Sequence, residues 1–283
     1  MLPPRNCQLY RRTQRKGLEE YRIKEPLDPA IQENTFDRLW EMPLEPVDQP
    51  NYRGKGQSRV YLWKTESHWL IVKKQSDYLT RNPSCPICGI PAAEREFQNL
   101  LFFRQIGIAT PTPVYFGRRR RRGHSQAILI TEYASDFLSL QTLLSQWQQE
   151  IPNPSAKKKV IQAVALEIRR LHHLRLCHRH LVPKHILLNP ACSPAKVMFI
   201  DLEAVRRFIP FRKNRQAELA SLNNRSRLVS RTDKLRFLFA YLGISKWTPQ
   251  AKKWAREILR KSDIKRRKSE NRLKNFHFHS IPL

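Results

Sequence analysis

The sequence predicts an α+β fold in two parts, an antiparallel sheet with one helix in the N-terminal half and a mainly helical C-terminal half. Three observations predict it. Short runs rich in β-branched and aromatic residues occur in two pairs before residue 134. One segment with apolar residues at helical spacing separates the two pairs. After residue 134, nearly all apolar patterns follow the helical period instead.

Four strands are expected in the first half. A hairpin is predicted for the runs 60–63 and 69–73, and a second pair of strands for the runs 114–117 and 127–133. The loop of the second pair contains consecutive arginines at 118–122. We favour a solvated hairpin tip over a dedicated phosphate-binding patch for this arginine run.

Pro91 opens the helix between the two strand pairs, where Phe97, Leu100 and Leu101 fall at helical spacing. The second half contains four helical patterns and one clear strand, at 197–200. Ser155 is the expected N-cap of the second helix. The four helical patterns cover 137–147, 156–173, 232–242 and 249–261.

This division predicts four regions along the chain. Prolines interrupt any periodicity in residues 1–50, which we expect to form an N-terminal extension. A strand-rich lobe over 51–133 and a helical lobe over 134–262 follow, and a basic tail covers 263–283. A strand-rich lobe followed by a helical lobe is the order of a protein kinase, so a protein-kinase-like two-lobe fold is the expectation.

The charge of the chain indicates an anionic partner. Lys and Arg number 53 against 24 Asp and Glu, for a formal net charge of +29. From residue 204 onward there are 22 basic and 5 acidic residues, so the excess is concentrated in the last third. Nucleic acid, an anionic membrane surface and a phosphorylated glycolipid would all be attracted, and charge alone does not rank them.

Cysteine usage and hydropathy predict a cytoplasmic protein. An odd number of cysteines, 5, fits a reducing compartment better than a disulfide framework. No run reaches the roughly 18 apolar residues of a membrane span, and the basic start lacks an apolar signal segment. Cys85 and Cys88 resemble half of a zinc site that Cys177 and His178 could complete, but we favour an ordinary loop there.

Candidates for phosphoryl transfer from ATP occur in kinase order. Gly54, Gly56 and Ser58 lie where a turn could approach phosphates, although ordinary turns look the same. Lys73 ends the second strand and Glu96 lies on the next helix, so the two could pair over the α- and β-phosphates. A surface Lys and Glu is the alternative for that pair. Glu132, near the end of the fourth strand, is a further candidate for nucleotide binding.

The segment 176–188 has the layout of a kinase catalytic loop, with His180 and His185 inside it. Asp201 follows the strand 197–200, at a strand end where a carboxylate could hold Mg²⁺. His172, on the long helix, is expected to be a packing or surface residue.

The chain resembles the lipopolysaccharide kinase (Kdo/WaaP) family, and most closely its InaA-like branch. The resemblance extends from about residue 51 to residue 243. It is strongest in Val72-Lys73-Lys74-Gln75, Arg95-Glu96-Phe97, Pro183-Lys184-His185-Ile186 and Ile200-Asp201-Leu202-Glu203.

The resemblance implies ATP- and Mg²⁺-dependent phosphorylation of an inner-core lipopolysaccharide sugar, on a heptose or Kdo hydroxyl, at the cytoplasmic face of the inner membrane. Lys73 would hold the ATP phosphates and Glu96 would fix Lys73. Asp201 would bind Mg²⁺, and His185 takes the place of a second metal ligand. The core glycolipid and anionic lipids become the expected partners of the basic surface.

His180 departs from the family pattern, because the heptose kinases have a catalytic aspartate at this place. Imidazole can accept a proton near pH 7, so His180 as base, Glu203 as a substitute base and a nucleotide-binding pseudokinase with a regulatory or stress role all stay open. The metal and phosphate ligands favour an active enzyme. A basic nucleic-acid-binding protein is the other alternative, but no recognisable module supports it.

Overall fold

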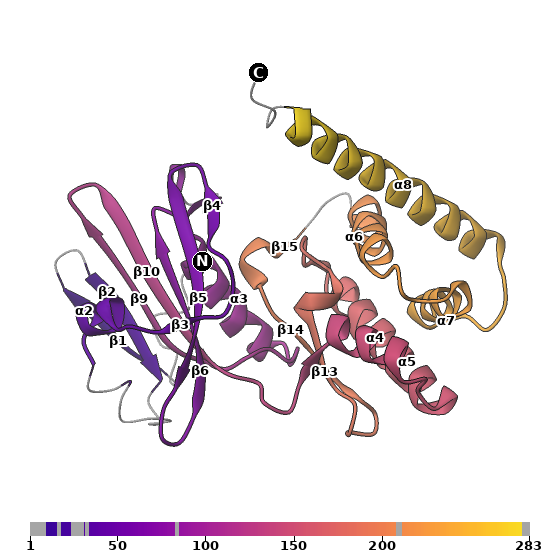
Figure 1. The fold of residues 1–283 in the computed structure, drawn as a ribbon, viewed down its shortest axis with the longest axis horizontal. Coiled ribbons are helices and arrows are strands. Elements are labelled where there is room, and N and C mark those ends of the chain that lie inside the picture. Colours follow the sequence, from indigo (N-terminus) through magenta and orange to yellow (C-terminus); the bar gives the residue numbers. More distant parts are fainter. Residues whose placement is uncertain are drawn as a thin grey trace. The chain divides into compact units, whose positions relative to one another are not determined.

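The computed structural model describes residues 10–15, 18–23, 31, 34–82, 85–207 and 211–278 (Figure 1). The chain separates into two compact units. Unit 1 comprises residues 1–135 together with Asp201–Glu203, and unit 2 comprises residues 136–200 and 204–283.

Unit 1 is built on an antiparallel sheet with the strand order β1-β2-β9-β10-β6-β5-β3, and β4 pairs with β5 as well. This arrangement confirms the predicted antiparallel sheet. Its strands are β1 (Tyr10–Arg15), β2 (Leu18–Ile23), β3 (Glu45–Pro46), β4 (Asn51–Arg53), β5 (Gly56–Lys64), β6 (Trp69–Ser76), β9 (Pro113–Arg121) and β10 (His124–Glu132).

The strand β6 is central to this unit because it pairs with β5 on one side and β10 on the other. Leu70 and Val72 of β6 are buried with Ile128 and Ile130 of β10, at every second position as a sheet face requires. The short helix α2 (Phe36–Glu41) packs on this core through buried Phe36. Lys73 therefore lies on a rigid strand in the middle of the sheet.

Helix α3 (Ala92–Gln105) carries the helical pattern that the sequence predicted between the strand pairs. Phe97 and Leu100 are buried, and the Phe97 ring stacks on Phe116 of β9 with 4.9 Å between centroids. A hairpin of β7 (Leu79–Asn82) and β8 (Cys85–Pro91) precedes the helix. The expected loop around Cys85 and Cys88 is thus a strand, and the side chains of these two cysteines lie outside the described residues.

The sequence predicts a separate N-terminal extension over residues 1–50. In the structure, β2 lies within this range, pairs with β9 and extends the sheet of unit 1. The prediction of a solvated hairpin tip holds for Arg120, Arg121 and Arg122, which are exposed, but not for the start of the arginine run. Positions 118–121 belong to β9, where Arg118 contacts the carboxylates of Glu19 and Glu94 at 2.7 and 2.6 Å. Pairing with two buried acids holds Arg118 against the sheet, whereas Arg122 lies at the turn.

Unit 2 is mainly helical, as predicted. It contains the strand predicted at 197–200, which is β14, and further short strands that the sequence did not predict. Its helices are α4 (Leu140–Gln149), α5 (Pro154–His173), α6 (Phe211–Arg225), α7 (Arg231–Leu242) and α8 (Pro249–Phe278). The strands are β11 (Leu138–Ser139), β12 (Leu176–Cys177), β13 (Ile186–Asn189), β14 (Lys196–Phe199) and β15 (Arg206–Arg207).

Two helix boundaries differ from the predictions. Asn153, not Ser155, caps α5: its side chain accepts from the backbone N–H of Ser155 and Ala156, and Pro154 occupies the first turn. Helix α8 continues to Phe278, so the expected boundary at 262/263 falls inside it. Among the described residues, no helix has both the length and the apolar character needed to cross a membrane.

Unit 2 also contains a helix that the sequence analysis missed. Helix α6 has few apolar residues, yet Leu219, Ala220 and Leu222 are buried, and so are the polar Gln216 and Glu218. A cavity of about 590 Å³ with a mainly apolar lining lies among α4 to α8, next to residues such as Leu144, Val164 and Leu238.

Candidate active site

Lys73 and Glu96 form an ion pair in unit 1. Lys73 Nζ lies 2.5 Å from Glu96 Oε2 and 3.9 Å from Asp201 Oδ1. The side chains of Lys73 and Glu96 are only 15% and 8% exposed, which excludes the alternative of a loose surface pair. The structure thus brings together three of the residues that the sequence singled out.

The charges in this cluster stabilise one another. Burial by itself would lower the pKa of the Lys73 ammonium, but the carboxylates of Glu96, Asp201 and Glu203 raise it well above its ordinary value. Burial raises the pKa of Glu96, and Lys73 opposes that effect. Lys73 is therefore positively charged at every physiological pH, as a side chain that binds phosphate must be.

Asp201 adopts a left-handed backbone conformation, with φ of 59°. Non-glycine residues rarely take this conformation, and such strain is concentrated at functional sites. Oxygen atoms of Asp201, Glu96 and Glu203 all lie within 4.8 Å of one another. Carboxylate oxygens are the ligands that Mg²⁺ prefers, so the residues present fit a magnesium ion at Asp201.

Glu203 is buried and forms an ion pair with Arg53 of β4, with 2.9 Å between Oε1 and Nη2. Arg53 immediately precedes the turn Gly54-Lys55, which connects β4 to β5. Gly54 has φ of 60° and open space around it, whereas a Cβ on Gly56 would lie 2.2 Å from the Asp77 carbonyl oxygen. Only Gly54 therefore lies at an open turn, and Gly56 serves close packing.

Ser58 and Glu132, the other two candidates for nucleotide binding, occupy different surroundings. Ser58 is buried, and its hydroxyl accepts a hydrogen bond from Gln75 Nε2 at 3.1 Å. Glu132 is partly buried at the end of β10. It lies three positions along that strand from Leu129, the register partner of Lys73, a separation of roughly 10 Å.

The predicted catalytic loop lies in unit 2. His180 is exposed, and its carbonyl oxygen accepts a hydrogen bond from His185 Nδ1 at 2.9 Å. The two rings are 6.4 Å apart between centroids. The backbone N–H of Ile200 donates to the His185 carbonyl at 3.2 Å, so β14, which leads to Asp201, is tied to this loop.

A buried carboxylate that the sequence analysis missed holds the start of this loop. Glu218 of α6 accepts the backbone N–H of His178 at 3.1 Å and that of Arg179, whose φ is 67°. His172 Nε2 contacts the same carboxylate at 2.9 Å, and His172 Nδ1 contacts the Tyr241 hydroxyl at 2.8 Å. No local pattern marks a glutamate on a weakly amphipathic helix, so sequence reasoning had no signal for it.

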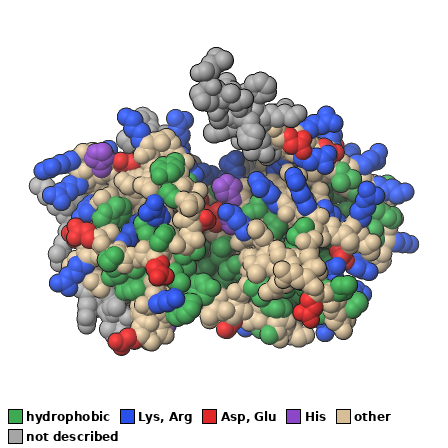
Figure 2. Space-filling model, viewed as in Figure 1, with side chains coloured by type: hydrophobic (Ala, Val, Ile, Leu, Met, Phe, Trp, Pro, Cys, Tyr) green, Lys and Arg blue, Asp and Glu red, His purple; other side chains and the backbone are tan. Residues whose placement is uncertain are grey.

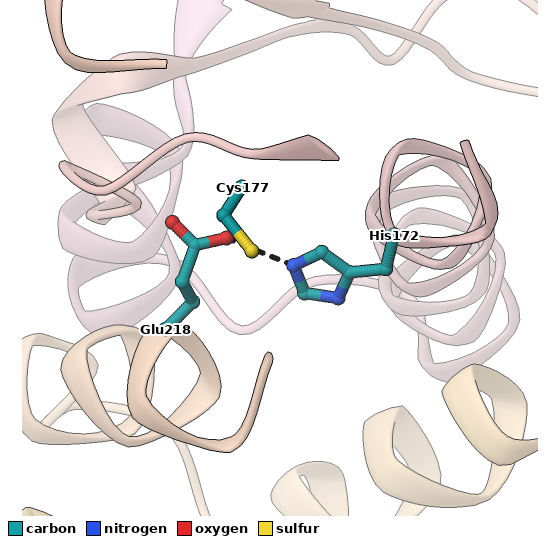
Figure 3. Close-up of side chains that lie close together, drawn as sticks. All are labelled: His172, Cys177 and Glu218. Atoms are coloured by element: carbon teal, nitrogen blue, oxygen red, sulfur yellow. Dashed lines mark hydrogen bonds and ion pairs between the residues drawn. The ribbon is translucent and has the colours of Figure 1, made fainter. Parts of the chain in front are cut away.

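Figure 3 shows His172, Cys177 and Glu218 pointing toward one another inside unit 2. Their ligand atoms are close enough for a metal ion, but the chemistry of the donors favours a hydrogen-bonded cluster. Burial and the neighbouring Glu218 raise the pKa of the Cys177 thiol to about 12, so the sulfur keeps its proton. His172 is thus a fully buried packing residue, as expected, with the added task of bonding Glu218.

Comparison with known proteins agrees with this geometry. The model of the lipopolysaccharide kinase (Kdo/WaaP) family matches residues 37–241. The Escherichia coli K12 protein InaA is 26% identical over 172 residues, which cover 61% of this chain and 79% of InaA. The lipopolysaccharide core heptose(I) kinase WaaP of Pseudomonas aeruginosa is 29% identical over 230 residues, 75% of this chain and 85% of that protein.

A solved structure of WaaP in complex with acyl carrier protein has the same fold. Its TM-score is 0.56 at 22% identity, and the match covers 84% of this chain and 97% of that one. The α+β fold class, with an antiparallel sheet first and a helical part after it, is confirmed. Since the family model covers well over half of the sequence, this chain belongs to the lipopolysaccharide kinase (Kdo/WaaP) family.

Proposed function

We propose that this chain is an ATP-dependent phosphotransferase that uses Mg²⁺ and phosphorylates a sugar hydroxyl, on heptose or Kdo, in the inner core of lipopolysaccharide. The observation that carries the proposal is the buried contact of Lys73 with Glu96 and Asp201. Phosphoryl transfer in kinases requires a lysine held by a helical glutamate and a nearby metal-binding aspartate. Membership of a kinase family supports the same reading.

Each residue has a defined part in this proposal. Lys73 binds the α- and β-phosphates, and Glu96 keeps its ammonium in place. The exposed backbone at Gly54, in the turn between β4 and β5, is assigned to approach the phosphates, whereas the buried Gly56 serves the packing behind that turn. Asp201 would hold Mg²⁺, which supplies positive charge to the phosphate oxygens when it is bound. Glu132, on strand β10 next to β6, is assigned to binding the nucleoside part of ATP.

His185 is assigned as the second metal ligand. Its Nδ1 donates to the His180 carbonyl oxygen, so a neutral ring carries its lone pair on Nε2, the nitrogen that would bind Mg²⁺.

His180 would orient the acceptor hydroxyl and take its proton as the oxygen bonds to the γ-phosphorus and ADP leaves. Positioning matters more than early deprotonation in a loose transition state, so a histidine suffices. If this is its role, His180→Asp preserves or raises the transfer rate. Absence of transfer in both forms would support a nucleotide-binding pseudokinase instead.

The test is calorimetric binding of ATP with and without Mg²⁺ to the wild type, Lys73→Met and Asp201→Asn. We expect saturable, Mg²⁺-dependent binding that both substitutions weaken by at least tenfold. Lys74→Met is the matched control, because the neighbouring Lys74 points to the carbonyls of Trp40 and Met42. Binding that none of the variants changes, or no binding at all, would contradict the kinase proposal.

The basic surface supports a glycolipid acceptor at an anionic membrane. Lys and Arg side chains dominate the charged surface visible in Figure 2. On α8, the exposed Lys252, Arg256, Arg260 and Arg267 lie opposite the buried Trp254. We therefore propose a peripheral location on the inner membrane, with nucleic acid as the less supported partner. Co-sedimentation of the protein with anionic and with neutral lipid vesicles tests the membrane location. Equal binding to both kinds of vesicle would contradict this location.

Acyl carrier protein is a further partner to test, because the solved WaaP was in complex with it. Co-purification of acyl carrier protein with this chain would support the partnership. A matched preparation at high salt would show whether the association is electrostatic.

A further inference from the structure

Helix α3 makes three polar contacts along one side, at positions three residues apart. Ala93 contacts Gln75, Glu96 contacts Lys73, and Asn99 contacts the carbonyl of Leu202. Residues three apart are neighbours on a helix surface, so these contacts follow the helix from its first turn to its third. All of them lie within unit 1.

The first contact caps the helix from another element. The backbone N–H of Ala93 is among those that a helix start leaves without an intrahelical partner, and Pro91 provides no side-chain cap. Gln75 Oε1 accepts that N–H at 2.7 Å. Gln75 is 1% exposed, and its Nε2 donates to Ser58 Oγ at 3.1 Å, which fixes the orientation of the amide.

The first two contacts share one face of β6. Lys73 and Gln75 are two residues apart on that strand, so their side chains point the same way, about 7 Å apart along it. Ala93 and Glu96 are separated by about 4.5 Å along the axis of α3. Two contacts between the same strand and helix fix both the rotation and the position of α3, and so hold Glu96 at Lys73.

The third contact reaches the residues that follow β14. Asn99 Nδ2 donates to the Leu202 carbonyl oxygen at 2.6 Å. Leu202 is buried and is the neighbour of Asp201, so this bond holds the backbone from which the Asp201 carboxylate projects. Helix α3 is thereby connected both to the strand that carries Lys73 and to the segment that carries Asp201.

We propose that Gln75 and Asn99 are positioning residues that hold α3 so that Lys73, Glu96 and Asp201 stay assembled for Mg·ATP. The proposal rests on the proposed function. In kinases the lysine–glutamate pair and the metal-binding aspartate must both be in place, and the position of this helix controls that. The side-chain amides of Gln75 and Asn99 are neutral, so the position of α3 does not depend on a further charged group.

The experiment measures Mg·ATP affinity by calorimetry for Gln75→Met and Asn99→Leu, which keep approximate size and remove the hydrogen bonds. Each is expected to weaken binding about tenfold, which corresponds to about 1.4 kcal/mol. Gln75→Glu keeps an oxygen for the Ala93 N–H and should recover most of the affinity. The controls are Gln126→Met, whose amide bonds Arg119, and Gln98→Leu, next to Asn99 on α3. Both should bind like the wild type.

A general loss of stability is distinguished by first removing the carboxylate that each residue positions. Gln75→Met is repeated in a Glu96→Gln background and Asn99→Leu in an Asp201→Asn background, where each substitution should change affinity less than about twofold. An equal loss in both backgrounds, or wild-type affinity in both single variants, overturns the proposal while leaving the kinase function intact. Absence of Mg·ATP binding in the wild type would instead overturn the proposed function and this inference together.

Discussion

Arg53 Nη2 donates a hydrogen bond to Glu203 Oε1 at 2.9 Å, between residues separated by 150 positions in the chain. The guanidinium also lies over the Tyr78 ring, 4.4 Å from its centroid. The Glu203 side chain is 8% exposed, while that of Arg53 is 42% exposed. The pair connects the strand that leads into the Gly54 turn with the segment that begins at Asp201.

Removing Arg53 should therefore cost more than removing an ordinary surface partner. Arg53→Gln leaves the buried Glu203 carboxylate without its cation and should lower the free energy of unfolding by about 1–2 kcal/mol, between the values for exposed and buried pairs. Urea denaturation measures this. The double variant with Glu203→Gln should be less destabilised than the sum of the single variants, and strict additivity would show that the two side chains do not interact.

Glu96 and Glu94 offer a matched comparison on one helix. Both are buried, and each forms one short ion pair, Glu96 with Lys73 at 2.5 Å and Glu94 with Arg118 at 2.6 Å. Glu96→Gln should weaken Mg·ATP binding about tenfold, because Lys73 loses the carboxylate that holds it. Glu94→Gln should lower stability but leave affinity within about twofold. Equal effects on affinity would mean that the Lys73 pair has no special role.

Glu218 should make stability depend on acid pH. Burial alone would raise the pKa of its carboxyl, but His172 and the backbone N–H of Arg179 hold that pKa below its ordinary value. A carboxyl group whose pKa is lower in the folded than in the unfolded state stabilises the fold at pH values above its unfolded pKa, near 4.3. This stabilisation is lost as pH falls through the folded pKa.

Glu218→Gln should lower the free energy of unfolding by about 2–4 kcal/mol at pH 7, and the difference from the wild type should narrow as pH falls below about 5. Urea midpoints between pH 7 and pH 3.5 measure it. The control is Glu257→Gln on the surface of α8, which should leave the midpoint at pH 7 unchanged. A difference that stays constant with pH would contradict the role assigned to the charge.

Cys177 should resist alkylation in the folded protein. Its thiol is buried and its pKa is raised to about 12, so roughly one molecule in 10⁴ carries the thiolate at pH 8. Cys192, which is partly exposed, is the internal control. Peptide mapping after iodoacetamide treatment should show Cys192 modified and Cys177 protected until urea is added. Fast modification of Cys177 in the native state would indicate that the cluster in Figure 3 opens.

The sequence allowed the fold class to be predicted because hydrophobic periodicity is local. The strands around Lys73 and the helix carrying Glu96 follow from residues within a few positions of each other. Helix α6 was missed for the same reason, since its mean pattern is polar and its apolar residues are few. Asn153 is the N-cap in place of the predicted Ser155, because Pro154 favours the first helical position and the helix therefore begins two residues earlier.

The sequence by itself determined which residues could carry the chemistry, because Lys73, Glu96 and Asp201 stand in kinase order at the ends and starts of recognisable elements. Only the tertiary structure decided which polar side chains hold them there. Gln75, Asn99, Arg53 and Glu218 act on partners in other elements, up to 150 positions away. The tertiary structure also buries Ser58, which the sequence offered as a candidate for nucleotide binding. A hydrogen bond between distant elements depends on their packing, and no local pattern in the sequence records it.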